Sequence, residues 1–263
     1  MLGDLLRYEL DGVVTVKSYM VGIELAISLA PITLRSSSSA VVPSPHTVVL
    51  DDAVFHDLID VEAFEENNML CLEVPTGELS LMNYRICDNR PTENGYLAGG
   101  SIPFTVFSHI ETPQTPNMLE ISMRLRSDLP ERFVGQDIRV QLPVPACTRS
   151  VSSQFSESSQ SRPVVVHHQS PSMIEWNVGR LRGGSEIQIK MKLTLSEAPT
   201  PAIRRAIGPI SLRFEVSDYL PSGFSIRKLS AVPSRGHTYS NTNTEIKPWI
   251  RNITRASSYV VRI

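Results

Sequence analysis

Cysteine is scarce in this chain of 263 residues, and so are net charge and long hydrophobic runs. The cysteines number 3 (Cys71, Cys87 and Cys147), and no two of them form a CxxC pair, which argues against a disulfide framework and fits a reducing compartment. No apolar run reaches the roughly 18 to 20 residues that a membrane-spanning helix needs. A formal net charge of −2 gives no global attraction to nucleic acid. We therefore expect a globular chain with no nucleic-acid partner.

Helix signals are also weak, whereas alternating hydrophobicity is common. The 19 prolines are scattered along the chain and argue against long helices. Apolar and polar residues alternate through four stretches, residues 119–125, 138–144, 187–195 and 210–216. Successive strand side chains point to opposite faces, so each stretch has one apolar and one polar face. This pattern predicts an all-β fold of antiparallel sheets packed face to face.

Turn and loop signals separate these stretches. The turn signals are Asp11-Gly12, Thr76-Gly77, Gly99-Gly100, Gly183-Gly184 and Pro221-Ser222-Gly223. Residues 35–45 and 150–161 are serine-rich and carry too little apolar surface to offset their ordering entropy. We predict that both are loops, and that the turn-rich residues 88–100 form a junction between subdomains.

Reactive residues do not gather into a recognisable catalytic or metal-binding motif. Walker, GxGxxG, GxSxG and HExxH patterns are all absent. Adjacent strand residues such as His167 and His168 point opposite ways, which makes a poor metal clamp. Asp51 and Asp52 are more typical of turn formers than of facing hydrolase carboxylates. We expect no enzyme activity, no metal and no cofactor; a β-sandwich hydrolase is the weakest alternative.

A small group of basic residues allows two interpretations. Lys190, Lys192 and Arg213 lie at polar positions of the predicted strands. They are either the solvated face of a sheet or a strip that contacts phospholipid headgroups.

Four segments of the chain, taken in order, carry a family resemblance. They are Asp11–Met20 (DGVVTVKSYM), Leu50–His56 (LDDAVFH), Val74–Arg85 (VPTGELSLMNYR) and Pro248–Thr254 (PWIRNIT) with the ending Tyr259–Ile263 (YVVRI). Together they resemble the mu homology domain of adaptor-complex medium (mu) subunits, and an ordered set of four is more specific than any one segment. Trp176-Asn177, Gly183-Gly184 and Gly208–Leu212 are most similar to the branch of the fourth adaptor complex.

The resemblance implies a fold and a division of the chain. We expect an elongated domain of two antiparallel β-sandwich subdomains, the second inserted into the first. The first would comprise residues 1–89 plus 220–263, and the inserted one residues 90–219. The family domain begins with one more strand, and Met1 lies near the turn after it. We therefore expect a fragment or a shortened gene product.

The resemblance also implies a function and partners. Such domains read tyrosine-based sorting motifs in cytosolic tails of transmembrane cargo during vesicle transport. Expected partners are two large and one small adaptor subunit, with a phosphoinositide membrane surface as a further one. The implied location is cytoplasmic, peripheral on trans-Golgi network and endosomal membranes. The alternative is a structural coat domain that binds no motif.

The matching motif-binding positions include an aromatic–cation group. Trp249 and Arg251 are two residues apart, so on a strand both would face one way and hold a tyrosine ring, with Lys17 nearby. Spacing alone favours a core tryptophan instead. Ile226, Leu229 and Ile250 would line the pocket for the bulky apolar residue. In the family an aromatic residue and an aspartate on the additional first strand complete the tyrosine pocket.

A second peptide-binding face is implied by the fourth-complex branch. Phe55 and Glu65 match its positions, and Asn83 stands where the branch pattern has arginine. Asparagine pairs with an acidic motif residue less well than arginine does. Phe55 could equally be a core strand residue.

Overall fold

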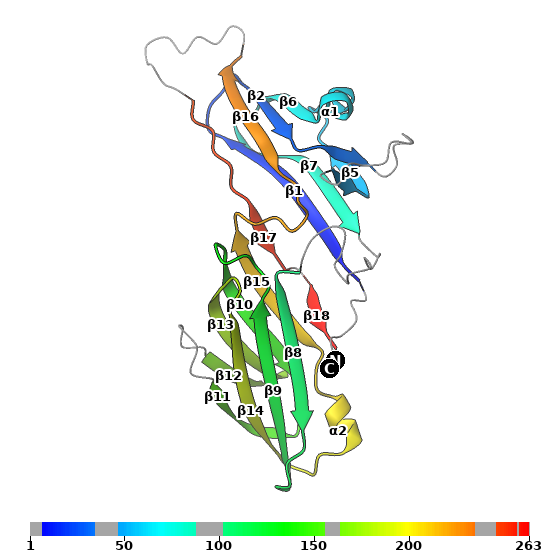
Figure 1. Cartoon of the computed structure of the whole chain (residues 1–263), viewed down its shortest axis with the longest axis vertical. Helices are drawn as coiled ribbons and strands as arrows, with labels where there is room; N and C mark the ends of the chain where they lie inside the picture. The colour runs from blue at the N-terminus through cyan, green and yellow to red at the C-terminus, as the bar shows by residue number, and fades with distance from the viewer. Residues whose placement is uncertain are drawn as a thin grey trace. The chain divides into compact units, whose positions relative to one another are not determined.

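A computed structural model describes residues 7–34, 47–87, 102–155, 164–234, 246–256 and 258–262. The chain divides into two compact units: Met1–Ser101 with Leu220–Ile250, and Ile102–Tyr219 with Arg251–Ile263. Both are built almost entirely from antiparallel strands (Figure 1), which confirms the all-β prediction. No helix among the described residues is long and apolar enough to span a membrane.

The first unit has two antiparallel three-stranded sheets and a small parallel pair. One sheet has the order β1-β7-β5, the other β16-β2-β6, and β3 pairs with β4. Their bounds are β1 Glu9–Ser18, β2 Ile23–Leu29, β3 Ile32–Leu34, β4 Val48–Leu50, β5 Asp52–Phe55, β6 Met69–Val74, β7 Gly77–Cys87 and β16 Ile226–Pro233. The apolar faces enclose one core, which includes Leu50, Leu70, Leu81 and Met82 with no exposed surface.

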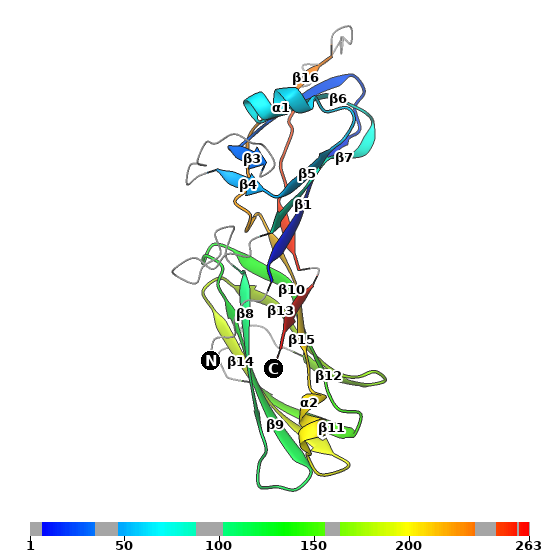
Figure 2. The same ribbon diagram turned by 90° about the vertical axis from the view of Figure 1, so that its right-hand side faces the viewer.

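A short helix, α1 (Val61–Asn67), lies next to β6 (Figure 2). The Ala63 N–H donates to the Asp60 carboxylate, which caps the first turn (3.1 Å). Asn68 ends the helix in the left-handed conformation, and its side-chain oxygen accepts from the Ile32 N–H (3.1 Å). Phe64 turns inward to the core. Caps at both ends allow a helix of only two turns.

Asp11-Gly12 lies inside β1, so the turn predicted there is wrong. Gly12 pairs with Tyr84 on β7, and the Tyr84 ring lies directly over it. The same ring stacks on Phe224 with centroids 4.7 Å apart. The glycine is therefore a packing requirement of the strand rather than a turn signal.

The second unit is a sandwich of a four-stranded and a longer sheet. The orders are β11-β14-β9-β8 and β12-β13-β10-β15-β17, with β18 also paired to β15. The bounds are β8 Phe104–Glu111, β9 Met118–Ser127, β10 Val134–Pro143, β11 Thr148–Phe155, β12 Val164–Gln169, β13 Ser172–Arg182, β14 Glu186–Leu195, β15 Ile210–Ser217, β17 Ile253–Arg255 and β18 Tyr259–Val261, with a helix α2 at Pro201–Arg205. All four alternating stretches lie in strands of this unit, except that Val144 follows the end of β10.

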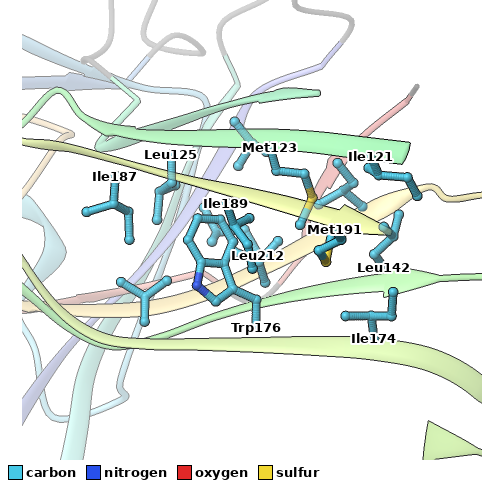
Figure 3. Close-up of a cluster of buried hydrophobic side chains, with 14 of the residues drawn as sticks. Ile121, Met123, Leu125, Leu142, Ile174, Trp176, Ile187, Ile189, Met191 and Leu212 are labelled. Carbon is cyan, nitrogen blue, oxygen red and sulfur yellow. The ribbon is translucent and has the colours of Figure 1, made fainter. Parts of the chain in front are cut away.

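Trp176 fills the centre of the second core. It has no exposed surface and packs among Ile189, Met191 and Leu212, between the two sheets (Figure 3). Apolar side chains from both sheets meet here because each strand turns its apolar face inward. The core of this unit is thus supplied by the alternating sequence pattern.

The C-terminal residues join the second unit, whereas the sequence interpretation grouped them with the first. β17 and β18 both pair with β15. The Tyr259 hydroxyl donates to the Phe104 carbonyl oxygen (2.8 Å), and burial raises the pKa of Tyr259 to about 12. Backbone pairing rather than side-chain pattern decides this assignment.

The predicted loop at residues 150–161 is wrong in its first part. Residues 150–155 belong to β11, which pairs with β14 along Val151 to Phe155. An edge strand needs little apolar surface, because its outer face and free edge meet water. Several predicted loops and turns lie outside the described residues: residues 156–161, residues 35–45, and residues 88–100 with the Gly99-Gly100 turn.

We predict that Gly12→Ala destabilises the protein by about 1–3 kcal/mol, because an added methyl group overpacks the core. Its Cβ would lie 2.0 Å from Cζ of Tyr84. Urea unfolding measures the loss, and Thr15→Ala, on the same strand with an exposed side chain, is the control. Tyr84→Leu in the Gly12→Ala background should recover part of the loss. Equal stability of Gly12→Ala and the wild type would refute this packing.

Candidate functional site

Trp249 is an exposed tryptophan, not a core one. It is 77% exposed, whereas Trp176 has no exposed surface. Residues 246–252 form no strand, and pairing resumes only at Ile253. Pro248 has no N–H to donate, which weakens pairing just before the tryptophan. The expected strand under Trp249 and Arg251 is therefore absent, although the indole is open to a ligand.

Arg251 is held within the second unit. Its guanidinium lies 4.0 Å from the Glu215 carboxylate. The Asp218 N–H donates to the carbonyl oxygen of Asn252, the next residue (2.8 Å). The boundary between the two units falls between Ile250 and Arg251. Trp249 thus belongs to the first unit, and a shared tyrosine pocket of Trp249 and Arg251 remains a prediction.

Lys17 offers an exposed positive charge near the end of β1. Its ammonium lies 3.8 Å from the carboxylate of Glu78, its partner on β7. It also lies over the ring of Tyr19, 5.7 Å from the centroid. Tyr19, followed by Glu78, raises the pKa of Lys17, so the amine is protonated at neutral pH. Tyr19 itself is 80% exposed, and sequence reasoning gave it no role.

The apolar positions divide between two segments. Ile226 and Leu229 lie on β16, which among the described residues is an edge strand paired only with β2. The strand register shifts between Ile226 and Lys228, and this shift lets Ile226 and Leu229 both pack against the core of the first unit. Both stay partly accessible, whereas Ile250 is 40% exposed in the segment that forms no strand. The structure thus supplies an open strand edge with apolar side chains beside it.

The structure does not bring the three second-face residues together. Phe55 pairs with Met82 and packs on Phe64, with ring centroids 4.6 Å apart. Asn83, the next residue on β7, points to the opposite, exposed face of the sheet. Glu65 is an exposed residue of α1. Alternation along β7 separates Phe55 from Asn83.

Around Asn83 the exposed face of β1-β7-β5 is hollowed by about 290 Å³. Val13 and Val54 flank Asn83 across the strands and are 58% and 59% exposed. Arg85, two residues further on the same face, donates to Asp11 (2.7 Å), which raises the pKa of Arg85. The sequence analysis gave no role to Val13, Val54 or Arg85. The available signal was the two valines, which are apolar residues at outward strand positions.

The remaining chemical candidates do not converge on one site. The Cys87 N–H donates to the Asp51 carboxylate (2.5 Å), while Asp52 points outward on β5. His167 and His168 alternate on β12, as the strand period requires. Across the described ranges, no three His, Cys, Asp or Glu residues gather as metal ligands.

The whole chain matches one protein family. The model of the "Adaptor complexes medium subunit family" covers residues 2–263. The AP-4 complex subunit mu of Arabidopsis thaliana is 28% identical over 274 residues, which covers 99% of this chain and 55% of the relative. The Homo sapiens AP-4 complex subunit mu-1 is 26% identical over 272 residues, with the same coverage of 99% and 55%. The chain therefore spans about half the length of these relatives.

Solved structures share the fold. The yeast delta-COP-I mu-homology domain matches with a TM-score of 0.65 at 16% identity, over 97% of this chain and 90% of that chain. The same domain complexed with a Dsl1 WxWxV peptide matches with a TM-score of 0.61 at 17% identity, over 97% and 89%.

We predict that iodide quenches the emission of Trp249 but not that of the buried Trp176. Trp249→Phe should abolish the quenchable component, and Trp176→Phe should retain it. Stern–Volmer measurements give both components, with circular dichroism confirming that each variant is folded. Unchanged iodide quenching in Trp249→Phe would show that the indole is covered.

Proposed function

We propose that this chain, which belongs to the family of adaptor-complex medium subunits, binds tyrosine-based sorting motifs. Members of this family are non-enzymatic coat adaptor proteins. The observation that carries the proposal is the exposed Trp249, 77% accessible in a segment without a strand partner. The ligand is an extended tail peptide of a membrane protein. Its tyrosine ring packs against the Trp249 indole.

The free edge of β16 supports docking of an extended peptide. β16 pairs on one side only, with β2, within the described part of the chain. An added peptide strand gains main-chain hydrogen bonds there, while pockets for alternate side chains give specificity. Ile226 and Leu229 provide apolar surface, and Lys17 provides a cation. The yeast delta-COP-I domain complexed with a WxWxV peptide has the same fold, which supports peptide binding as the function.

The relatives support a proposal for the wider setting. AP-4 mu subunits match 99% of this chain, so we place the domain in a heterotetrameric vesicle coat with two large subunits and one small one. It acts in the cytoplasm on trans-Golgi network and endosomal membranes, where a phosphoinositide surface assists attachment. The alternative is a coat scaffold without motif binding, which the absence of a strand at Trp249 and Arg251 favours.

A second peptide surface lies on the exposed face of β1-β7-β5. Val13 and Val54 supply apolar contacts on this face. Asp11, which accepts from Arg85, and Asp52 line the same hollow, so the surface fits an aromatic motif residue rather than an acidic one.

We predict that a Tyr-x-x-Leu tail peptide binds this chain with micromolar affinity, a binding free energy of about −8 kcal/mol. Trp249→Ala should weaken binding about tenfold through loss of aromatic stacking. Isothermal titration calorimetry measures both, with an Ala-x-x-Leu peptide as the ligand control. Val164→Ala, an exposed residue of β12 in the second unit and away from the proposed docking strand, is the matched protein control.

The same titrations distinguish the cargo-binding function from the scaffold alternative. A scaffold domain would give no heat with any tyrosine-motif peptide, while wild type and Trp249→Ala would both co-purify with the other adaptor subunits. That pair of results would contradict the cargo-binding function.

A further inference from the structure

Charge is distributed very unevenly between the two units. The first holds 16 acidic and 9 basic residues, a net charge of −7. The second holds 11 acidic and 16 basic residues, a net charge of +5. The overall value of −2 conceals this opposition. The basic unit therefore attracts anionic partners that the net charge of the chain does not predict.

Three arginines form a diagonal across neighbouring strands of the second unit. Arg139 on β10 lies directly opposite Arg213 on β15. Arg255 on β17 lies opposite Glu215, two residues from Arg213 on the same face. We call Arg139, Arg213 and Arg255 the arginine run. All three are on the outer face of the sheet, away from the Trp176 core.

Carboxylates orient the two ends of the arginine run. Arg139 donates from Nε and Nη2 to one oxygen of Asp137, at 3.0 and 2.8 Å, and this carboxylate raises the pKa of Arg139. Arg255 donates from Nε to Glu215 (2.7 Å), and the Arg251 guanidinium lies 4.0 Å from the same side chain. Each arginine keeps further N–H donors free, since a guanidinium has five.

Arg213 has no counter-ion among the described residues, although it faces another arginine. Like charges directly opposite on adjacent strands destabilise a sheet. Arg139 and Arg255 remain substantially exposed, with 43% and 67% of their side-chain surface accessible. The arginine run thus presents exposed, oriented N–H donors at a cost to the stability of the sheet. Such an arrangement is expected of a binding surface.

We infer that the arginine run binds an acidic, extended protein segment with glutamate or aspartate at alternate positions. Opposite residues on paired strands lie about 5 Å apart and diagonal ones about 7–8 Å apart. Alternate side chains of an extended peptide repeat at about 6.6–6.8 Å, which falls between these spacings. Arg213 is the central contact, and its flanking arginines take the neighbouring carboxylates.

A peptide fits this face better than a membrane surface does. Asp137, Glu175 and Glu215 lie among the arginines and would repel a continuous anionic bilayer. The cations of the other sheet, including Lys190 and Lys192, lie on its own outer face, so one plane cannot meet both groups. A segment with few carboxylates can contact the arginines alone.

This surface lies within the second unit and does not include Trp249. The inference therefore extends the proposed function to acidic residues of a partner protein, and it can succeed or fail independently. Binding of a tyrosine-motif peptide tests Trp249, whereas binding of an acidic peptide tests Arg213.

The experiment is fluorescence anisotropy with a labelled Glu-Ser-Glu-Ser-Glu peptide, which lacks tyrosine and bulky apolar residues. We expect binding that weakens with salt, and about a three- to fivefold loss of affinity in Arg213→Gln. Arg149→Gln, an exposed arginine on β11 of the other sheet, removes the same charge and should bind like the wild type. Arg213→Gln should keep or gain thermal stability, because the like-charge pair is relieved.

Three results would overturn the inference. The first is equal peptide affinity in Arg213→Gln and the wild type, and the second is an equal loss of affinity in Arg213→Gln and Arg149→Gln. The third is no peptide binding together with binding to phosphatidylserine-containing vesicles that Arg213→Gln abolishes, which would make the arginine run a membrane contact. Loss in Arg213→Gln with retained binding of a Tyr-x-x-Leu peptide would support it.

Discussion

Backbone pairing of the last strands with β15 is the constraint on which the candidate site depends. β17 and β18 bind both halves of β15, so the chain from Arg251 onward is fixed to the second unit. Residues 246–250, just before it, belong to the first unit and form no strand. Trp249 therefore remains exposed on a short connecting segment, where a ligand rather than a neighbouring strand can contact its indole.

The sequence predicts the sandwich of the second unit well, because its signal is redundant. Each of four strands alternates apolar and polar residues over at least seven positions, and Ile121, Ile138, Ile189 and Ile210 are all fully buried. The Gly183-Gly184 turn joins β13 to β14 as expected. The family assignment follows from the ordered segments and is confirmed by the match over residues 2–263.

The rest depends on partners that a linear pattern cannot reveal. Gly12 signals a turn in sequence but lies under the Tyr84 ring, a contact between residues far apart in the chain. The polar strand β11 forms because β14 offers an edge. Trp249 and Trp176 are the same residue type, and only the tertiary pairing makes one exposed and the other buried. The separation of Phe55 from Asn83 follows from their register on β5 and β7.

The two units carry opposite net charge, and we propose a different kind of recognition for each. The central claim is that residues 246–250, which form no strand, are the segment that a tail peptide occupies. Hydrogen–deuterium exchange with mass spectrometry tests it directly, with and without a tyrosine-motif peptide. The account predicts fast exchange of this segment in the free protein, and slower exchange there and along β16 when the peptide is bound. Slow exchange of residues 246–250 in the free protein, unchanged by the peptide, would contradict it.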